Sequence, residues 1–232
     1  MPWDRRYAFL LGLTGTAGAL DALAFLHLGK VFTSFQSGNV LFVGLGLGNG
    51  DGGLVVRAGA VLLAFFLGAA AGGRLIGTHL SPRRVSVELQ VAGIEAALLA
   101  VFATLWLAVG SPDGGARVAL LAIGALAMGI QAALSLSLKI PNVMTVALTA
   151  TIAALGQRAG IGGPSPREDL PSTPLLAALL STYVAVAIVI ATLPAGAALS
   201  LIPLGLLAGG VGADAALQHG VRRPGRARRA VT

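Results

Sequence analysis

The stretch TSFQSGNV, residues 33–40, interrupts two apolar runs near the start of the chain. Five of its eight residues are polar: Thr33, Ser34, Gln36, Ser37 and Asn39. Polar or non-helical backbone is tolerated at membrane depth only where protein or a water-filled cavity covers it. If the flanking runs lie in a membrane, this stretch is expected to face an interior site. The alternative is an interfacial loop followed by an irregular helix start.

The rest of the chain has the composition of an integral membrane protein. Its 232 residues have a mean hydropathy of +0.85 and only 11% are charged, whereas about a quarter are charged in a soluble domain. Six apolar runs can cross about 30 Å of hydrocarbon as helices, and two are shorter and more polar. The runs are continuous rather than alternating, which favours helices over a barrel. In order, they span roughly 8–28, 31–48, 54–80, 85–110, 116–138, 142–156, 173–198 and 199–217.

The two shorter runs resemble each other. Placing VFTSFQSGNVLFVG (31–44) over VMTVALTATIAALG (143–156) pairs Thr33 with Thr145 and Ser37 with Thr149. Just upstream, Asp21 in GALDAL has Gln131 in GIQAAL as its counterpart. If the two repeats face each other, these two side chains are expected to meet near the bilayer midplane. We interpret the chain as two internal repeats of four segments. The repeats cover about 8–110 and 116–217 of a single membrane domain, 1–220, and a basic tail follows at 221–232.

The arginines predict the topology. Arg5 and Arg6, the loop with Arg83 and Arg84, and the arginine-rich tail should all lie in the cytoplasm. An even number of crossings must then separate them, so one run in each half should not cross fully. The two short polar runs are the candidates, as re-entrant or broken helices. The expected fold is therefore an all-α membrane protein with about six spans in two inverted repeats, both termini being cytoplasmic; the alternative is that all eight runs cross.

Asp21 is the most informative side chain. It lies well inside the first run, where a carboxylate costs about 2.5–3.5 kcal/mol on insertion scales. A functional role is the default hypothesis for such a group, and the alternative is a structural aspartate bonded to a serine or threonine of the next segment. Glu95 lies equally deep in its own run. The predicted substrate or ion pathway comprises Asp21, Gln36, Ser37, Asn39, Glu95, Gln131, Thr145 and Thr149.

Several classes of chemistry lack support in the sequence. The chain has no cysteine, no HExxH motif and no glycine-flanked serine with a partnering histidine. We therefore expect no catalytic residues, no metal and no cofactor. The basic tail is interpreted as a contact with anionic lipid rather than with nucleic acid.

At GALDALAFLHLGKVFTSFQSGNVLFVGLGLGNGD, residues 18–51, the chain resembles the YoaK-like family of bacterial membrane proteins, numbered 1275 among the domain families of unknown function. The family pattern opens with glycine, two further residues, Asp and Ala, here Gly18, Asp21 and Ala22. It continues with Phe-Leu and a Thr-Gly-Asn motif, which reads Ser37-Gly38-Asn39 here. A later Gly-x-Gln block is similar to Gly129 and Gln131 of this chain. The family's asparagine after that glutamine is Ala132, and its second Thr-Gly is Thr149-Ala150. The resemblance implies an inner-membrane protein of about six helices and no established substrate.

These observations leave three functional hypotheses. The leading one is a small-solute transporter or channel-like permease of the bacterial inner membrane, because the duplication and the polar residues at depth suggest a site near the bilayer midplane. The second is a non-transporting scaffold or lipid-interacting protein, and an intramembrane enzyme comes third. The expected partners are the lipid bilayer and an unknown small solute, and a homo-oligomer is compatible with the sequence.

Overall fold

The structure is a computed structural model that describes residues 6–78, 87–138, 145–146, 148–159 and 173–221. Within these residues the chain forms helices and no strand, which confirms the predicted all-α class. Arg5, Arg83, Arg84 and the tail after Val221, which carried the topology prediction, lie outside them. The helices are α1 (Arg6–His27), α2 (Gln36–Asn49), α3 (Gly52–Thr78), α4 (Val87–Val109), α5 (Gly114–Ser137), α6 (Thr149–Ala159), α7 (Thr173–Thr192), the 3-10 helix η1 (Ala197–Leu201) and α8 (Ile202–Val221).

Helix length separates spans from shorter segments. Among the described residues, α1, α3, α4, α5 and α7 are long and apolar enough to cross a membrane, and Ala197–Ala213 is a shorter apolar stretch. By contrast, α2 has 14 residues and α6 has 11. At 1.5 Å per residue they reach only about 21 and 17 Å, which is less than the hydrocarbon thickness. The two short helices coincide with the two short polar runs of the sequence.

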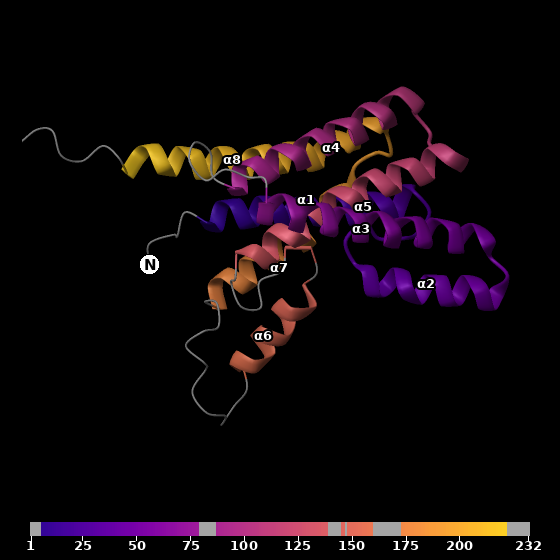
Figure 1. Cartoon of the computed structure of the whole chain (residues 1–232), viewed down its shortest axis with the longest axis horizontal. Helices are drawn as coiled ribbons and strands as arrows, with labels where there is room; N and C mark the ends of the chain where they lie inside the picture. The colour runs from indigo at the N-terminus through magenta and orange to yellow at the C-terminus, as the bar shows by residue number, and fades with distance from the viewer. Residues whose placement is uncertain (1–5, 79–86, 139–144, 147, 160–172, 222–232) are drawn as a thin grey trace, which may run out of the picture.

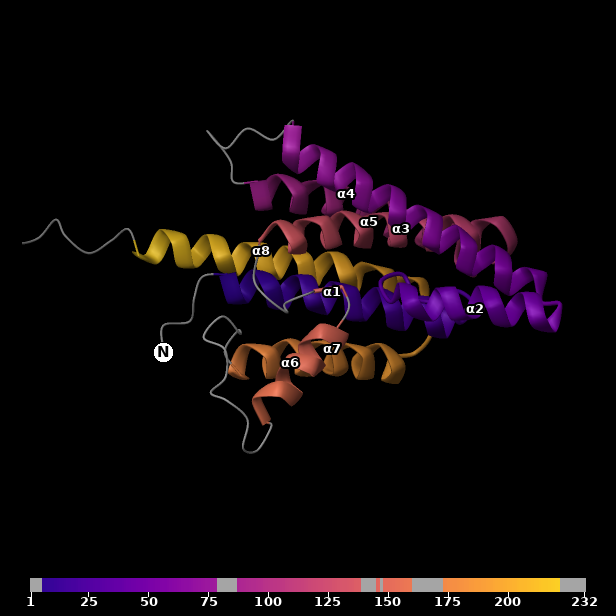
Figure 2. The same cartoon turned by 60° about the horizontal axis from the view of Figure 1, so that its bottom comes forward.

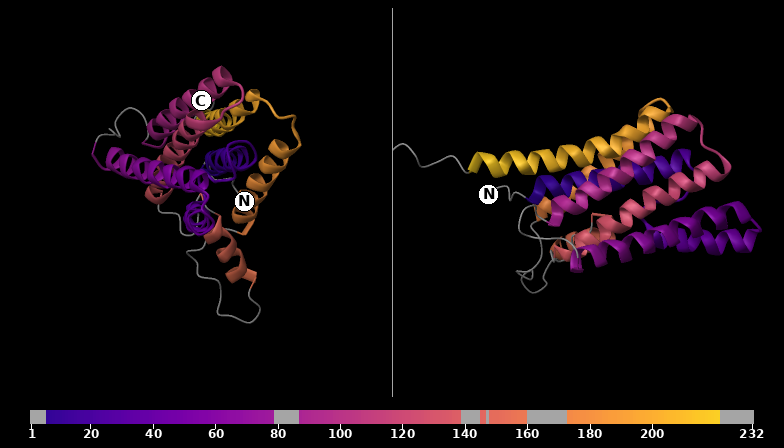
Figure 3. Two further views of the ribbon diagram at one scale, coloured as in Figure 1. Left: turned by 90° about the vertical axis from the view of Figure 1, so that its right-hand side faces the viewer. Right: turned by 45° about the horizontal axis from the view of Figure 1, so that its top comes forward.

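Two helices form the centre of the bundle. The most apolar windows of α1 and α5 are each 72% buried, against 17% for α3 and 22% for α7. Helix α1 packs against α7 and α8, whereas α5 packs against α3 and α4. Figure 2 shows α8, α1 and α7 side by side, and the end-on view in Figure 3 shows α1 surrounded by other helices. The short helices lie outside this centre, α2 along α3 and α6 along α7.

The two central helices, α1 and α5, start at opposite ends of the bundle. Helix α1 begins, and α8 ends, at the same end of the bundle (Figure 1). The turn between α4 and α5 lies at the opposite end (Figures 1 and 3). Helix α5 therefore starts at the end of the bundle opposite to the start of α1.

Glycines set the closest helix crossings. A Cβ added to Gly12 of α1 would lie 2.7 Å from the Cα of Gly210 in α8. A Cβ on Gly68 of α3 would lie 2.2 Å from the carbonyl oxygen of Leu126 in α5. Lipid tails are as apolar as leucine, so helices in membranes gain association energy mainly from close packing between small residues. These glycines are thus used where helices touch, whereas others, such as Gly93, meet nothing within 4 Å.

Candidate functional site

Asp21 holds the segment between α1 and α2. Its Oδ1 accepts hydrogen bonds from the Thr33 amide at 2.7 Å, the Thr33 hydroxyl at 2.9 Å and the Ser34 amide at 2.8 Å. Its Oδ2 accepts from the Ser34 hydroxyl at 2.6 Å and the Tyr183 hydroxyl of α7 at 2.7 Å. Asp21, Thr33 and Ser34 are all buried. Five donors satisfy a carboxylate at this depth, which favours the structural alternative for Asp21.

Asn39 also holds this segment. Its Oδ1 accepts from the Phe32 amide at 3.0 Å, and its Nδ2 donates to the Phe32 carbonyl at 2.6 Å. Gln36 donates to the Thr33 carbonyl at 2.8 Å and accepts from Asn39 at 3.0 Å. A Cβ on Gly38 would lie 2.7 Å from the ring of Phe35. The Ser-Gly-Asn motif therefore combines space for an aromatic ring with an amide that pairs with the backbone.

The second half contains a related cluster. Gln131 of α5 donates to the Thr145 hydroxyl at 2.8 Å and to the Leu13 carbonyl of α1 at 3.0 Å. The hydroxyls of Ser135 and Thr145 are 2.6 Å apart. Gln131, Ser135 and Thr145 are buried. In both halves, a polar side chain on a central helix binds the threonine that precedes a short helix.

A glycine precedes each of these polar side chains for a steric reason. A Cβ on Gly18 would lie 3.0 Å from the Tyr183 carbonyl oxygen of α7. A Cβ on Gly129 would lie 2.2 Å from the Phe65 carbonyl oxygen of α3. The glycine lets a neighbouring helix cross closely, and the polar residue within the next turn reaches the polar segment. This explains the Gly-x-x-Asp and Gly-x-Gln spacings.

Some buried acceptors have no donor among the described residues. They include both carboxyl oxygens of Glu95 and the side-chain oxygen of Gln131, and Nε2 of His27 also has no hydrogen-bond partner there. The Thr14 hydroxyl, next to Leu13, is also without a partner there. Helices α4 and α5 are antiparallel, and Glu95 on α4 is as many residues from the loop that joins them as Met128 is on α5. Met128 precedes Gln131 by about one helical turn, so Glu95 lies about one helical turn from the level of Gln131. A carboxyl group at such depth is stable when it is neutral or beside a cation.

The predicted pathway residues do not form one cluster. Asp21, Gln36 and Asn39 surround the segment before α2, whereas Gln131 and Thr145 meet elsewhere. Gln131 bonds to α1 two helical turns before Asp21, so the expected meeting of these two side chains is not observed. Ser37 and Thr149 are exposed, at equivalent places near the starts of α2 and α6.

Tyr183, Ser34 and Ser135 were missed by sequence reasoning. Tyr183 was detectable, because a buried tyrosine hydroxyl usually needs a hydrogen-bond partner and this tyrosine lies inside an apolar run. Ser34 lies within the polar stretch already identified.

Over the described part of the chain, no group of three or more acidic or histidine side chains is placed to hold a metal.

The spans and their buried polar clusters define a polytopic, all-helical membrane protein. The chain belongs to the family described as protein of unknown function (DUF1275), whose model matches residues 9–224. It is similar to the UPF0700 transmembrane protein YoaK of Bacillus subtilis (strain 168), with 29% identity over 140 residues, or 60% of this chain and 61% of that protein. The similarity thus spans less than two thirds of that relative's length. No solved structure matches. The family predicted from the sequence is confirmed.

Proposed function

We propose that the protein is a small-solute transporter or channel-like permease of the bacterial inner membrane, with both termini in the cytoplasm. The observation that carries the proposal is a repeat in the helix packing. Helix α1 packs on α7 and α8 as α5 packs on α3 and α4, and α2 packs on α3 as α6 packs on α7. If each helix is replaced by the helix four later in chain order, and the count returns from α8 to α1, the same interfaces are obtained. Helices α1 and α5 start at opposite ends of the bundle. Inverted repeats of this kind are common in secondary transporters.

The polar clusters support the same interpretation. The Asp21–Thr33 and Gln131–Thr145 hydrogen bonds join equivalent helices in the two halves. In repeat-built transporters, substrates bind near the midplane beside interrupted helices. The donors around Asp21 are used within the protein, whereas Glu95 and Gln131 keep acceptors without a described donor. We therefore place the solute path nearer to Glu95 and Gln131 than to Asp21, and the proposal includes neither catalysis nor a cofactor.

A non-transporting scaffold is the second candidate. The fully bonded carboxylate of Asp21 favours it, since such a group contributes to a fixed, packed interior. The basic tail would then attract anionic lipid. A homo-oligomer and contact with the bilayer are compatible with either function. Neither function includes binding to nucleic acid.

An unbiased ligand screen followed by uptake separates the two candidates. The purified protein is screened by thermal shift against a metabolite library, and compounds that raise its Tm are tested for uptake into proteoliposomes. We expect uptake to be lost in Gln131→Leu and retained in Thr104→Val, because Gln131 is buried and Thr104 is exposed on α4. Both variants are first checked for folding by size exclusion. A protein that folds, binds no metabolite and transports none would support the scaffold.

A further inference from the structure

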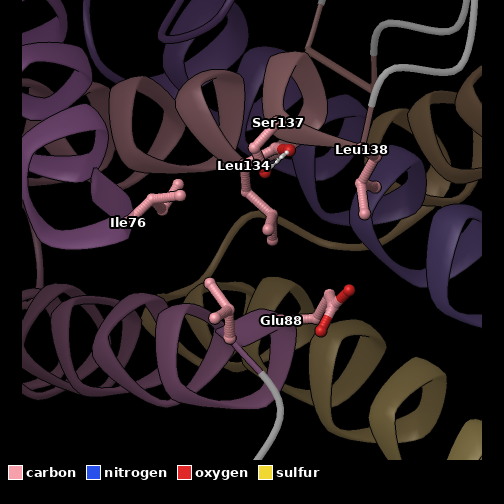
Figure 4. A pocket seen from close by; sticks show the side chains of 6 residues that line it. Ile76, Glu88, Leu134, Ser137 and Leu138 are labelled. Carbon is pink, nitrogen blue, oxygen red and sulfur yellow. Dashed lines mark hydrogen bonds between the residues drawn. The ribbon is translucent and has the colours of Figure 1, made fainter. Parts of the chain in front are cut away.

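A cavity lies between three spans at the end of the bundle where α3 and α5 finish and α4 begins. Its volume is about 270 Å³. Figure 4 shows Leu134 pointing into it from α5, Ile76 from α3 and Glu88 from α4. We call this cavity the vestibule. It is lined by Ile76, Val87, Glu88, Leu134, Ser137 and Leu138.

The described charges that line the vestibule favour a cation. Among the described lining residues, Glu88 is the charged one. Helices α3 and α5 end there, at Thr78 and Ser137, and helix C-termini carry partial negative charge. The N-terminus of helix α4 carries partial positive charge, and Glu88 lies beside it in the first turn. Arg74 is exposed and lies two residues before Ile76, on a different face of α3. Arg83, Arg84 and Lys139 lie next to these helix ends in the sequence and outside the described residues.

The helix seam that leads inward from the vestibule also offers acceptors. Glu88 and Glu95 are seven residues apart on α4, which is two turns or about 10 Å along one face. On α5, Leu138, Leu134 and Gln131 follow each other at intervals of about one turn. The buried oxygens of Glu95 and Gln131 lack described donors. A ligand that moves along this seam must therefore supply hydrogen-bond donors or positive charge.

We propose that the vestibule binds a small organic cation of the primary alkylammonium type, with the ammonium group on Glu88 and a short alkyl chain against the apolar walls. This rests on the proposed transport function, for which it names a substrate class. Ile76, Val87, Leu134 and Leu138 form the apolar walls. Ser137 also lines the cavity, and its hydroxyl already donates to the Leu134 carbonyl at 2.7 Å. Apolar walls with one fixed charge are typical of small-ligand sites.

The test is direct binding of n-butylammonium to the full-length protein in nanodiscs, measured by isothermal titration calorimetry against empty nanodiscs. Two probes of similar size are controls: neutral n-butanol and anionic butyrate. We expect Glu88→Gln to weaken binding at least tenfold. Leu138→Trp, which fills the cavity, should also weaken it. Asp113→Asn should leave it unchanged, because Asp113 is exposed and precedes α5 in the turn after α4, which lies at the opposite end of the bundle.

The outcomes decide both proposals separately. Equal binding of butanol and butylammonium, or a Glu88→Gln protein within twofold of the wild type, would overturn the cation site. Binding of butylammonium with this Glu88 dependence, but without uptake into proteoliposomes, would leave the site standing and count against transport. Uptake of another solute, without butylammonium binding, would support the permease and reject this substrate class.

Discussion

The hydroxyl of Tyr183 donates to the carboxylate of Asp21 over 2.7 Å, although 162 residues separate them in the chain. This bond joins α7 to α1, at the crossing that Gly18 makes possible. The same carboxylate holds Thr33 and Ser34, which precede α2. A side chain from the second half of the protein therefore helps to fix the entry to a short helix of the first half.

This arrangement predicts a graded loss of stability. Tyr183→Phe removes one of five donors and should lower the free energy of unfolding by about 0.5–1.5 kcal/mol. Asp21→Asn keeps the shape but weakens the charge-assisted bonds, so we expect a larger loss. Asp21→Ala leaves five donors unpaired and should be the most destabilising change. The measurement is thermal unfolding in detergent.

The order of the three variants is the critical result. If Asp21 instead served mainly as a substrate group, Asp21→Asn would melt close to the wild type and lose ligand binding. A wild-type Tm in Asp21→Ala would contradict the structural role assigned to this carboxylate. Thr104→Val is a suitable control, because its hydroxyl is exposed and bonds only to its own helix.

Two glycine substitutions should have opposite effects. A Cβ on Gly129 would meet the backbone of α3, at 2.2 Å from the Phe65 oxygen and 2.7 Å from the Ala69 nitrogen. Gly129→Ala should therefore separate α3 from α5 and cost about 1–3 kcal/mol. A Cβ on Gly93 of α4 meets nothing within 4 Å. Gly93→Ala should be neutral or stabilising by up to about 1 kcal/mol, because alanine favours helix.

Differential scanning fluorimetry of the two alanine variants provides the comparison. Expression and monodispersity should fall for Gly129→Ala and not for Gly93→Ala. If the two variants had the same Tm, close packing at Gly129 would not be a determinant of the fold.

The helical class and the two short segments could be predicted because they depend on local composition. Long apolar runs must form helices in lipid, and the polar residues of 33–40 have to be covered. The counterparts Thr33 and Thr145 are both found beside polar residues of the central helices. These correspondences depend on the order of residues along the chain, which the sequence displays directly.

The partners that come from distant helices could not be predicted. Asp21 and Gln131 were expected to meet, but α1 and α5 are offset so that Gln131 bonds near Leu13. Tyr183 reaches Asp21 because α7 crosses α1 at Gly18. The offset and the crossing are set by many weak contacts between small residues, and no short motif records them.

Asn39 predicts a local effect on backbone protection. Its side chain binds the Phe32 amide, whereas Asp21 binds the Thr33 and Ser34 amides. Asn39→Ala should increase hydrogen exchange at Phe32 more than at Thr33. Asp21→Ala should show the reverse. Amide exchange followed by NMR distinguishes the two patterns, and equal exchange at both sites in both variants would show that the segment opens as one unit.

The last prediction concerns topology. The turn between α4 and α5 lies opposite the end where α1 begins and α8 ends, so the side of Asp113 determines the side of both termini. The positive-inside rule places the termini and Arg83 in the cytoplasm, and Asp113 is then external. The chain has no cysteine, and Asp113 is exposed with no side-chain cap bond, so Asp113→Cys should be harmless. A membrane-impermeant maleimide should label Asp113→Cys in intact spheroplasts, whereas Arg83→Cys should react only after the membrane is opened. The reverse labelling of both positions would invert the orientation, and labelling of both from one side would contradict an odd number of crossings between them.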